Sequence, residues 1–364
     1  MKIGIIGTGR LGICKALCLY NAGYDVYCYD NNKEYLDKIK NKVFKSLEPS
    51  VNELLLTAAI NFSDNISDII TNCDVIFILI QTPSLKDGSY NHTYIDSFIN
   101  ELIVLGKQDI KKILVISSTV MPEYTNNILK KIEKYNYDVC YNPSFIAQGT
   151  IIKNLKNPNL ILIGENRHES GKIIEEIHKK IIENGDEATI CRMSTLEAEI
   201  TKISINCFIT TKISFANMIG DLVKSKGYNP DVVLNAIGID KRIGNRYLKY
   251  GYGFGGPCFP RDNRALNYYA NANDFNFELC DTTDNLNHQH LLYQYNELKD
   301  SKEPIEFIYI TYKDESDILE ESQKLKLAIK LADNGCQVII KERDYVIEKL
   351  KESYDNLFTY ICIQ

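Results

Sequence analysis

The chain has 364 residues, of which 45% are hydrophobic and 25% are charged, and its formal net charge is -6. A length of this order suits two or three domains with hydrophobic cores, at roughly 100–200 residues per domain. The lysines are scattered among acids and form no clustered basic patch, so nucleic acid is not an expected partner. No run of about 18 apolar residues is present, so no membrane association is expected.

The compartment is predicted from the first residues and from the cysteines. The opening residues MKIGIIGTG form a predicted strand and turn, so no signal peptide is expected. Eleven cysteines cannot pair completely, and the cytosol keeps thiols reduced, so we expect free thiols in a cytoplasmic protein. Neither Cys14 with Cys18 nor His288 with His290 has further ligands nearby in sequence. No metal site is therefore expected.

Residues 1 to about 190 alternate short apolar runs with helical patterns. Nearly continuous hydrophobicity within such runs is typical of parallel strands that helices cover on both faces. The pattern therefore predicts an NAD-binding domain over residues 1–190 that is built on a doubly wound, Rossmann-type parallel sheet. The predicted strands are KIGIIG, DVYCYD, DVIFILI, ILVISS, DVCYN and LILIG.

The second half of the chain is predicted to hold a helical domain and a smaller α/β domain. Residues 194–227 keep an apolar stripe at helical spacing without proline, which predicts one long helix that ends at Gly227. A central helical domain is expected over residues 191–300. The segments IEFIYIT, ESQKLKLAIKLADNG and CQVIIKERD then repeat the order strand, helix, strand. They predict a short, Rossmann-like α/β domain over residues 301–364, apparently truncated.

The first predicted turn carries a dinucleotide-binding pattern. GIIGTGRLG has G-x-G-x-x-G spacing between a strand and a helix, where glycines permit a tight turn, close pyrophosphate approach and close helix packing. Asp30 follows the second predicted strand, where an acid accepts ribose hydroxyls and repels the extra phosphate of NADP. We predict NAD as the cofactor. The alternative is that these glycines only form a turn between strand and helix and bind no dinucleotide. The predicted contacts are Gly7, Thr8, Gly9, Arg10, Leu11, Gly12 and Asp30.

The stretch GYGFGGPCFPRD places Cys258 just before a predicted helix. Pro260 suits the first turn of a helix, and Asp262 lies where acids offset the helix dipole. A cysteine at a helix N-terminus favours the thiolate, which is the reactive form. The residues alone leave two hypotheses open, a nucleophile and a small buried hydrophobe.

Lys202 and Asn206 lie four residues apart on the predicted long helix, so their side chains share one face. Such a pair is unusual in an apolar core and ordinary on a solvated face. A functional pair and a solvated pair are therefore both open at this point.

Taken together, these motifs resemble the UDP-glucose dehydrogenase family, the nucleotide-sugar 6-dehydrogenases, over nearly the whole chain. The resemblance implies oxidation of UDP-glucose to UDP-glucuronate, a four-electron reaction that uses NAD twice and does not release the aldehyde. The matching segments besides the glycine turn are QTPSLKDGSYN, SSTVMPEYT, NPSFIAQGTIIKNLKNPNLILIG, EAEITKISINCFITTKISFAN, RIGNRYLKYGYGFGGPCFPRD and YKDESDILEES.

The resemblance also implies catalytic roles. Cys258 matches the nucleophile, whose thiolate adds to the aldehyde to give a thiohemiacetal and then a thioester. Lys202 and Asn206 match the pair that donates to the C6 oxygen, where negative charge develops. Asp262 matches an acid that orders water and assists proton transfer, and Thr119 matches a hydroxyl that holds the same water.

Binding roles follow from the same resemblance. Substrate contacts are expected from Phe145, Lys202, Asn206, Arg242, Tyr247, Lys249, Phe254, Gly255 and Lys313. Further cofactor contacts are expected from Thr82, Pro83, Thr119, Gln148 and Arg261. Arg242 resembles an arginine that reaches into a neighbouring subunit's sugar-nucleotide site, so the resemblance implies a homodimer built on the long helix.

The sequence also departs from the family pattern. Ser144 and Gln148 stand where the family carries two glutamates, and a serine hydroxyl cannot act as a carboxylate base near neutral pH. Glu320 stands where the family has an arginine, and the chain stops short of the family's usual end. The hydrolytic half of the reaction is therefore expected to be weakened most, and the grip on the nucleotide to be weaker.

Three alternatives remain open. The chain could oxidise another nucleotide sugar, such as GDP-mannose or a UDP-N-acetylhexosamine. It could be a catalytically impaired homologue that binds NAD or a UDP-sugar. It could also be a relative that oxidises β-hydroxyacids, although such an enzyme has no use for Cys258.

Overall fold

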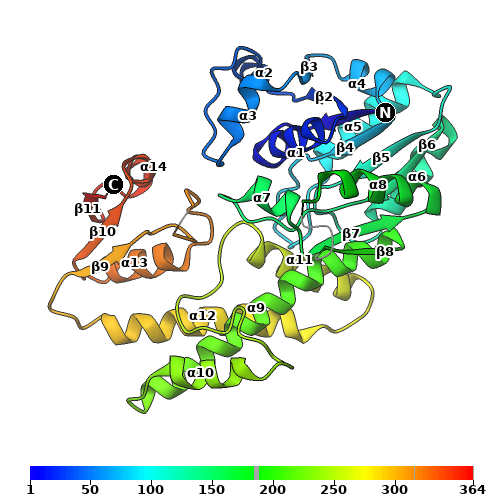
Figure 1. Cartoon of the computed structure of the whole chain (residues 1–364). Helices are drawn as coiled ribbons and strands as arrows, with labels where there is room; N and C mark the ends of the chain where they lie inside the picture. Colours follow the sequence, from blue (N-terminus) through cyan, green and yellow to red (C-terminus); the bar gives the residue numbers. More distant parts are fainter. Residues whose placement is uncertain (184–187, 315, 364) are drawn as a thin grey trace. The chain divides into compact units, whose positions relative to one another are not determined.

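The computed structural model describes residues 1–183, 188–314 and 316–363 (Figure 1). The chain divides into two compact units, Met1–Lys202 and Ile203–Gln364. The division falls within the long helix α9 (Thr195–Ser225), which agrees with the helix predicted over residues 194–227. The three domain boundaries expected from the sequence stay predictions.

The first unit contains an eight-stranded sheet in the order β3-β2-β1-β4-β5-β6-β7-β8. All six predicted strands are present, and β3 and β8 are additional. The strands are β1 (Lys2–Ile6), β2 (Asp25–Tyr29), β3 (Asn61–Ser63), β4 (Val75–Ile78), β5 (Lys112–Ile116), β6 (Tyr137–Tyr141), β7 (Leu160–Glu165) and β8 (Thr189–Met193). The predicted Rossmann-type parallel sheet is confirmed, and within it β6 and β7 pair antiparallel.

Helices of the first unit cover both faces of this sheet. Successive residues of a strand point to opposite faces, so Ile5 packs into one hydrophobic cluster and Ile6 into another. The first cluster includes α1, α3, α7 and α8, and the second includes α4, α5 and α6. These helices are α1 (Arg10–Asn21), α2 (Lys33–Lys40), α3 (Val51–Thr57), α4 (Ile66–Asn72), α5 (Thr93–Leu105), α6 (Tyr124–Ile132), α7 (Ile151–Lys156) and α8 (His168–Ile181).

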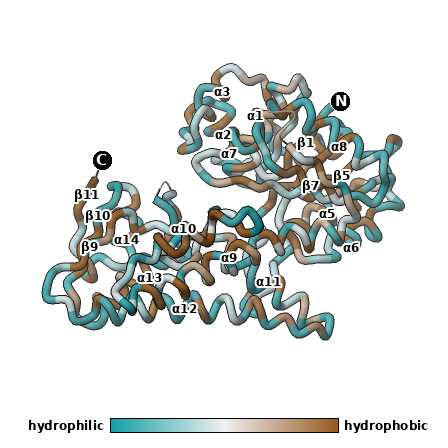
Figure 2. The backbone as a smooth tube through the Cα atoms, turned by 60° about the horizontal axis from the view of Figure 1, so that its bottom comes forward, coloured by the Kyte–Doolittle hydropathy of each residue, from teal (hydrophilic) through white to brown (hydrophobic). Residues whose placement is uncertain are grey.

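The second unit combines helices with a three-stranded parallel sheet in the order β11-β10-β9. The predicted strand, helix, strand order is confirmed, and α14 and β11 extend it. Hydrophobic residues from this sheet, α13 and α14 form a separate core, and Figure 2 shows the hydropathy along the chain. The elements are α10 (Pro230–Ile239), α11 (Phe259–Ala272), α12 (Glu278–Leu298), β9 (Ile305–Ile308), α13 (Gln323–Asp333), β10 (Val338–Glu342), α14 (Asp344–Tyr354) and β11 (Thr359–Cys362).

Two sequence expectations concern the whole chain. All eleven cysteines are free thiols, as predicted. Within the described residues, none of the helices combines the length and the apolar character needed to span a bilayer.

The turn between β1 and α1 depends on two glycines. Gly7 has a φ of +90°, a backbone conformation that residues other than glycine rarely adopt. A Cβ atom at Gly12 would lie 2.0 Å from the carbonyl oxygen of Gly7. The start of α1 can therefore approach the end of β1 only if residue 12 has no side chain.

We expect Gly12→Ala to lower the free energy of unfolding by about 1–3 kcal/mol or more, the usual cost of overpacking. Gly9→Ala is the matched control, because Gly9 has a φ of -54 and its Cβ would meet no atom within 4 Å. Urea unfolding followed by circular dichroism measures both variants. Equal stability of the two variants would contradict this account of the turn.

Candidate functional site

A cavity of about 560 Å³ opens in the first unit beside the glycine turn. The strand order reverses between β1 and β4, and in open α/β sheets ligands bind at the carboxyl ends of the strands at such a switch point. Gly7, Gly9 and Asp30 line the cavity, as do Leu79 and Ile80 just beyond β4. The predicted glycine turn and acid therefore meet at one cavity.

The residues around this cavity fit a dinucleotide. Asp30 accepts hydrogen bonds from the Thr8 amide at 2.8 Å and the Thr8 hydroxyl at 3.2 Å, and its other oxygen accepts from the Asn32 amide at 3.0 Å. These donors hold the half-buried carboxylate beside the turn. A Cβ atom at Gly9 would meet no protein atom within 4 Å, so this glycine leaves room for a ligand.

Several cavity residues were missed by sequence reasoning. They come from the segment after β2, from Gln81 at the start of the family-matching segment QTPSLKDGSYN after β4, and from the face of α5 that lines the cavity. The strand order alone could have indicated them, because α5 follows the segment after β4 at the switch point. The missed residues are Asn31, Gln81, Tyr94, Ser97, Phe98 and Glu101.

Other predicted cofactor contacts form two pairs in the first unit. The buried Thr82 hydroxyl donates to the Thr119 carbonyl at 2.7 Å, which joins the segments after β4 and β5. Arg10 donates to the Gln148 side-chain oxygen at 2.9 Å. This contact ties the first turn of α1 to the loop before α7. Leu11 instead packs against the hydrophobic core, and Pro83 is exposed.

Lys202 is buried and lies against the loop that follows β6. Its Nζ donates to the Ser144 carbonyl at 2.9 Å and lies 4.3 Å from the centre of the Phe145 ring. A cation held by a carbonyl and an aromatic face retains its charge at modest cost. The hypothesis that Lys202 lies on a solvated face of the helix was therefore wrong.

Asn206, one helical turn further along α9, belongs to the second unit and is also buried. Its side-chain amide donates to Asp262 Oδ2 at 2.6 Å, and Arg261 pairs with Oδ1 at 3.1 Å. The Asp262 side chain is completely buried. A buried carboxyl group needs such partners, and Asn206 and Arg261 supply one for each of its oxygens.

Cys258 is exposed and occupies the N-cap position of α11, with Pro260 in the first turn, as predicted. Its carbonyl accepts the Asp262 amide at 2.8 Å, the first hydrogen bond of the helix. Burial, followed by the charge of Cys258, raises the pKa of Tyr312, whose ring lies beside Gly256 in the same loop. Sequence reasoning missed Tyr312, although it directly precedes the predicted Lys313 in YKDE.

Cys207 follows Asn206 on α9 and has a different character. A hydrogen bond to Cys280, followed by burial, raises the pKa of Cys207. Its Sγ donates to the Asp262 carbonyl at 3.5 Å. This thiol therefore favours its neutral form, whereas Cys258 is exposed at the start of α11.

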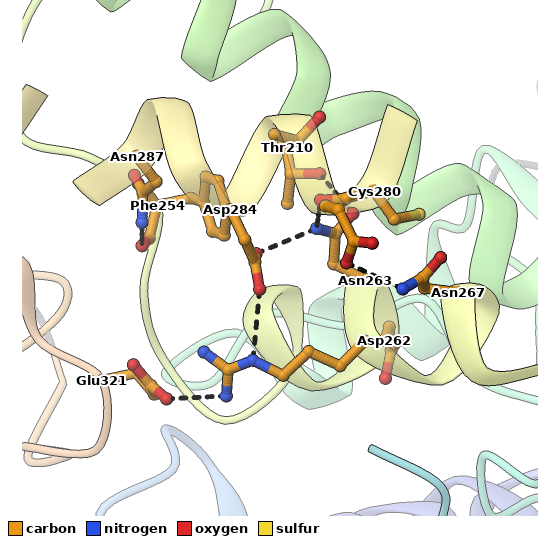
Figure 3. Close-up of polar contacts among 12 residues, drawn as sticks. Thr210, Phe254, Asp262, Asn263, Asn267, Cys280, Asp284, Asn287 and Glu321 are labelled. Atoms are coloured by element: carbon orange, nitrogen blue, oxygen red, sulfur yellow. Dashed lines mark hydrogen bonds and ion pairs between the residues drawn. The ribbon is translucent and has the colours of Figure 1, made fainter. Parts of the chain in front are cut away.

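The loop before Cys258 is packed tightly within the second unit. A Cβ atom at Gly255 would lie 2.3 Å from the Glu321 carbonyl, and one at Gly256 would lie 2.5 Å from the Tyr312 ring. Asn287 on α12 accepts from the Phe254 amide and donates to the Phe254 carbonyl, each at 2.9 Å (Figure 3). Phe254 is buried, so its side chain contributes to packing.

A series of hydrogen bonds between polar and charged side chains holds α11 beside α12 and the segment before α13. Arg264 donates to Asp284 at 3.2 Å and to Glu321 at 2.9 Å, and Asn263 donates to Asp284 at 2.9 Å (Figure 3). The same segment of chain therefore contacts α11 through Glu321 and the loop through Gly255. Sequence reasoning predicted Gly255 but missed Arg264, Asn263, Asp284 and Glu321.

The other predicted substrate residues of the second unit lie in varied surroundings. Arg242 pairs with Asp240 at 2.7 Å, and its side chain is 88% exposed. Tyr247 has a φ of +62, and its ring meets the edge of Phe259 at 6.3 Å. Lys249 is exposed, and Lys313 is half-buried.

Sequence comparison identifies two matching family models. Residues 1–182 match the UDP-glucose/GDP-mannose dehydrogenase family, NAD binding domain, and residues 196–289 match the central domain of the same family. The UDP-glucose 6-dehydrogenase TuaD of Bacillus subtilis is 30% identical over 77% of this chain. The chain spans 61% of that relative's length. The GDP-mannose 6-dehydrogenase of Pseudomonas syringae is 28% identical over 93% of this chain and 80% of its own.

A solved structure gives the same result for the fold. The UDP-glucose dehydrogenase of Pyrobaculum islandicum superimposes with a TM-score of 0.89 and 25% identity, covering 99% of this chain and 85% of its own. The glycine turn and its cavity lie within residues 1–182, and Cys258 lies within the matched central domain. The chain therefore belongs to the UDP-glucose/GDP-mannose dehydrogenase family.

Proposed function

We propose that the protein is an NAD-dependent dehydrogenase that oxidises UDP-glucose to UDP-glucuronate. The observation that carries the proposal is the exposed Cys258 at the start of α11, followed by the buried Asp262 that Asn206 holds at 2.6 Å. A thiol, a carboxylate and an amide donor are the groups that oxidation of an alcohol through a thioester requires. Similarity to UDP-glucose 6-dehydrogenases supports this substrate.

The cofactor is held by the first unit. The glycine turn would accommodate the pyrophosphate at the start of α1, and the Asp30 carboxylate would accept the ribose hydroxyls. Bound NAD supplies the chemistry of hydride acceptance, once for each of the two oxidations. Oxidation of the C6 alcohol removes a hydride and a proton from the sugar and leaves an aldehyde.

In the first oxidation, the protein stabilises developing charge and removes a proton. Negative charge forms on the C6 oxygen as its proton leaves. The proposed donors are Lys202 and Asn206, one turn apart on α9. Both are buried, so the electrostatic effect of each is larger than it would be in water. Asp262, through an ordered water, is the proposed proton acceptor.

In the second oxidation, Cys258 forms a covalent bond to the substrate. The thiolate sulfur adds to the aldehyde carbon and gives a thiohemiacetal. Loss of a second hydride from that carbon and of the proton from its hydroxyl leaves a thioester. Water then adds to the thioester carbon, the carbon–sulfur bond breaks, and the carboxylate, the thiol and one proton are released. The start of α11 favours the thiolate form of Cys258 before addition.

Hydrolysis is the step that this chain is expected to perform slowly. Ser144 stands where the family has a glutamate, and its carbonyl accepts from Lys202. A serine hydroxyl does not remove a proton from water near neutral pH. We therefore propose that thioester cleavage limits turnover.

Other nucleotide sugars remain candidate substrates. The GDP-mannose 6-dehydrogenase of Pseudomonas syringae matches 93% of this chain at 28% identity, which favours GDP-mannose as the second candidate. A UDP-N-acetylhexosamine dehydrogenase and an impaired homologue that only binds its ligands are the remaining hypotheses. An assay of NADH formation with each nucleotide sugar separates these hypotheses, because each predicts a different dependence on the sugar.

We also propose that the protein forms a homodimer through α9. Phe208, Phe215 and Leu222 recur every seven residues on this helix and are 65%, 48% and 58% exposed. An apolar stripe of this spacing is typical of a helix that packs against a partner. The free cysteines support a cytoplasmic location for the dimer.

Purified protein with NAD and UDP-glucose is expected to form two NADH for each UDP-glucuronate. Cys258→Ala is expected to abolish UDP-glucuronate, because no thioester can form, whereas Cys362→Ala, at the other exposed cysteine, is the matched control. Absorbance of NADH and chromatography of the sugars give the ratio. Full UDP-glucuronate formation by Cys258→Ala would contradict the covalent route, and NADH formed only with GDP-mannose would favour the second candidate.

Ser144→Glu is expected to raise kcat by at least about tenfold, since a positioned general base contributes two to four orders of magnitude. Ala147→Glu, an exposed position on the same loop, adds the same charge without the proposed role. Intact mass spectrometry is expected to show a sugar adduct on the wild type during turnover that is depleted in Ser144→Glu. Equal kcat in the two variants, or no adduct on the wild type, would show that hydrolysis does not limit turnover.

A further inference from the structure

A buried histidine in the second unit contacts the loop that leads to Cys258. The side chain of His290, on α12, is 1% exposed. Its Nε2 lies 2.6 Å from the Gly251 carbonyl, and its Nδ1 lies 2.8 Å and 3.0 Å from the two oxygens of Asp221 on α9. Gly251 begins the loop that ends at Cys258. His290 therefore links two long helices to the first residue of that loop.

The partners of His290 define its protonation state. A backbone carbonyl can only accept a hydrogen bond, so Nε2 must carry a proton. An ionised carboxylate can also only accept, so Nδ1 must carry one as well. The Tyr250 hydroxyl donates to the same carboxylate at 2.8 Å, so Asp221 also acts as an acceptor toward the residue that precedes Gly251. The contacts are thus satisfied together when His290 is an imidazolium cation paired with Asp221.

Further contacts fix the same short segment of the loop. Asn217 on α9 accepts from the Gly251 amide at 3.1 Å and donates to the Tyr252 carbonyl at 3.3 Å. Gln294 donates to the Gly251 carbonyl at 3.2 Å. His290 differs from these amides because it carries charge, and a charged donor forms the stronger hydrogen bond.

We propose that His290, held as an imidazolium by Asp221, is a positioning residue for the cysteine loop. Its bond to the Gly251 carbonyl anchors residues 251–258 on α12, and Tyr250 packs edge-on against its ring at 5.6 Å. The loop ends at the N-cap of α11, so the anchor holds the Cys258 thiol in the geometry that addition to an aldehyde requires. The consequence for turnover rests on the proposed function, whereas the protonation state and the order of the loop do not.

The protonation state is tested by nitrogen NMR on protein labelled with [¹⁵N]histidine. The chain has five histidines, and comparison with His290→Gln assigns the resonances of His290. We expect both ring nitrogens of His290 to carry protons at neutral pH, and Asp221→Asn to remove one of them. A neutral tautomer in the wild type would overturn the assignment. This measurement needs no turnover and no folded His290→Leu protein.

The positioning role is tested by hydrogen exchange and by kinetics. His290→Leu removes both bonds, whereas His290→Gln with Asp221→Asn keeps an amide donor for Gly251 without a buried charge. His288→Leu is the matched control, because His288 is an exposed histidine two positions away on the same helix. We expect the peptide spanning residues 249–258 to exchange about tenfold faster in His290→Leu, the effect of losing one buried charged hydrogen bond.

Kinetics supply a second readout for the same variants. In His290→Leu, kcat is expected to fall about tenfold with an unchanged KM for NAD, because the defect lies in orientation of the thiol. The double variant is expected to recover most of kcat and of the loop's protection from exchange. Identical exchange in His290→Leu and His288→Leu, or no recovery in the double variant, would overturn the proposal. If the wild type shows no turnover, the proposed function is refuted. The exchange and NMR results then still decide whether His290 positions the cysteine loop.

Discussion

The hydrogen bond between Asn206 and Asp262 is the contact on which the arrangement around Cys258 depends. Asp262 is completely buried, and a charged carboxylate without partners would be too costly to keep there. The Asn206 amide meets one oxygen and Arg261 meets the other, so the first turn of α11 lies beside the middle of α9. Since Cys258 caps that turn, the position of the thiol follows from the need to satisfy a buried charge.

The two chemically important turns of this chain use the same physical device. In each, a glycine-rich segment ends at the start of a helix, where backbone N–H groups are not yet bonded and attract negative charge. Under the proposed function, the charge would be a pyrophosphate at α1 and the thiolate of Cys258 at α11. The two turns differ in what the glycines accommodate. Gly12 makes room for protein backbone, whereas the space in front of Gly9 faces the cavity.

Features that depend on local sequence were predictable. The helix α9 repeats its apolar spacing over many turns, and Pro260 fixes the start of α11, so both were placed within a few residues. The strand β3 was missed because Asn61–Ser63 is short and largely polar and is defined by pairing with β2. The antiparallel direction of β7 was missed because strand direction depends on the path of the chain, which hydrophobicity does not encode.

The same distinction applies to the candidate site. Residues in motifs, such as Asp30 and Cys258, could be singled out from spacing and neighbouring residue types. Their partners could not, because Tyr312, Asn287 and His290 meet the cysteine loop from sequence positions far from it. Nothing in the local sequence around a histidine indicates that both of its nitrogens will face acceptors. Such contacts arise only when separate helices pack together.

The uneven burial of the thiols has a practical consequence for covalent chemistry. Burial raises the pKa of the thiols of Cys14, Cys28 and Cys140, so these groups are slow to react with electrophiles. Cys258 and Cys362 are the exposed thiols, and of the two only Cys258 caps a helix. A mild alkylating reagent should therefore discriminate between identical functional groups by local field alone. Such a reagent would modify mainly Cys258 among the eleven thiols, and the amount of label bound would give the number of Cys258 thiols able to react.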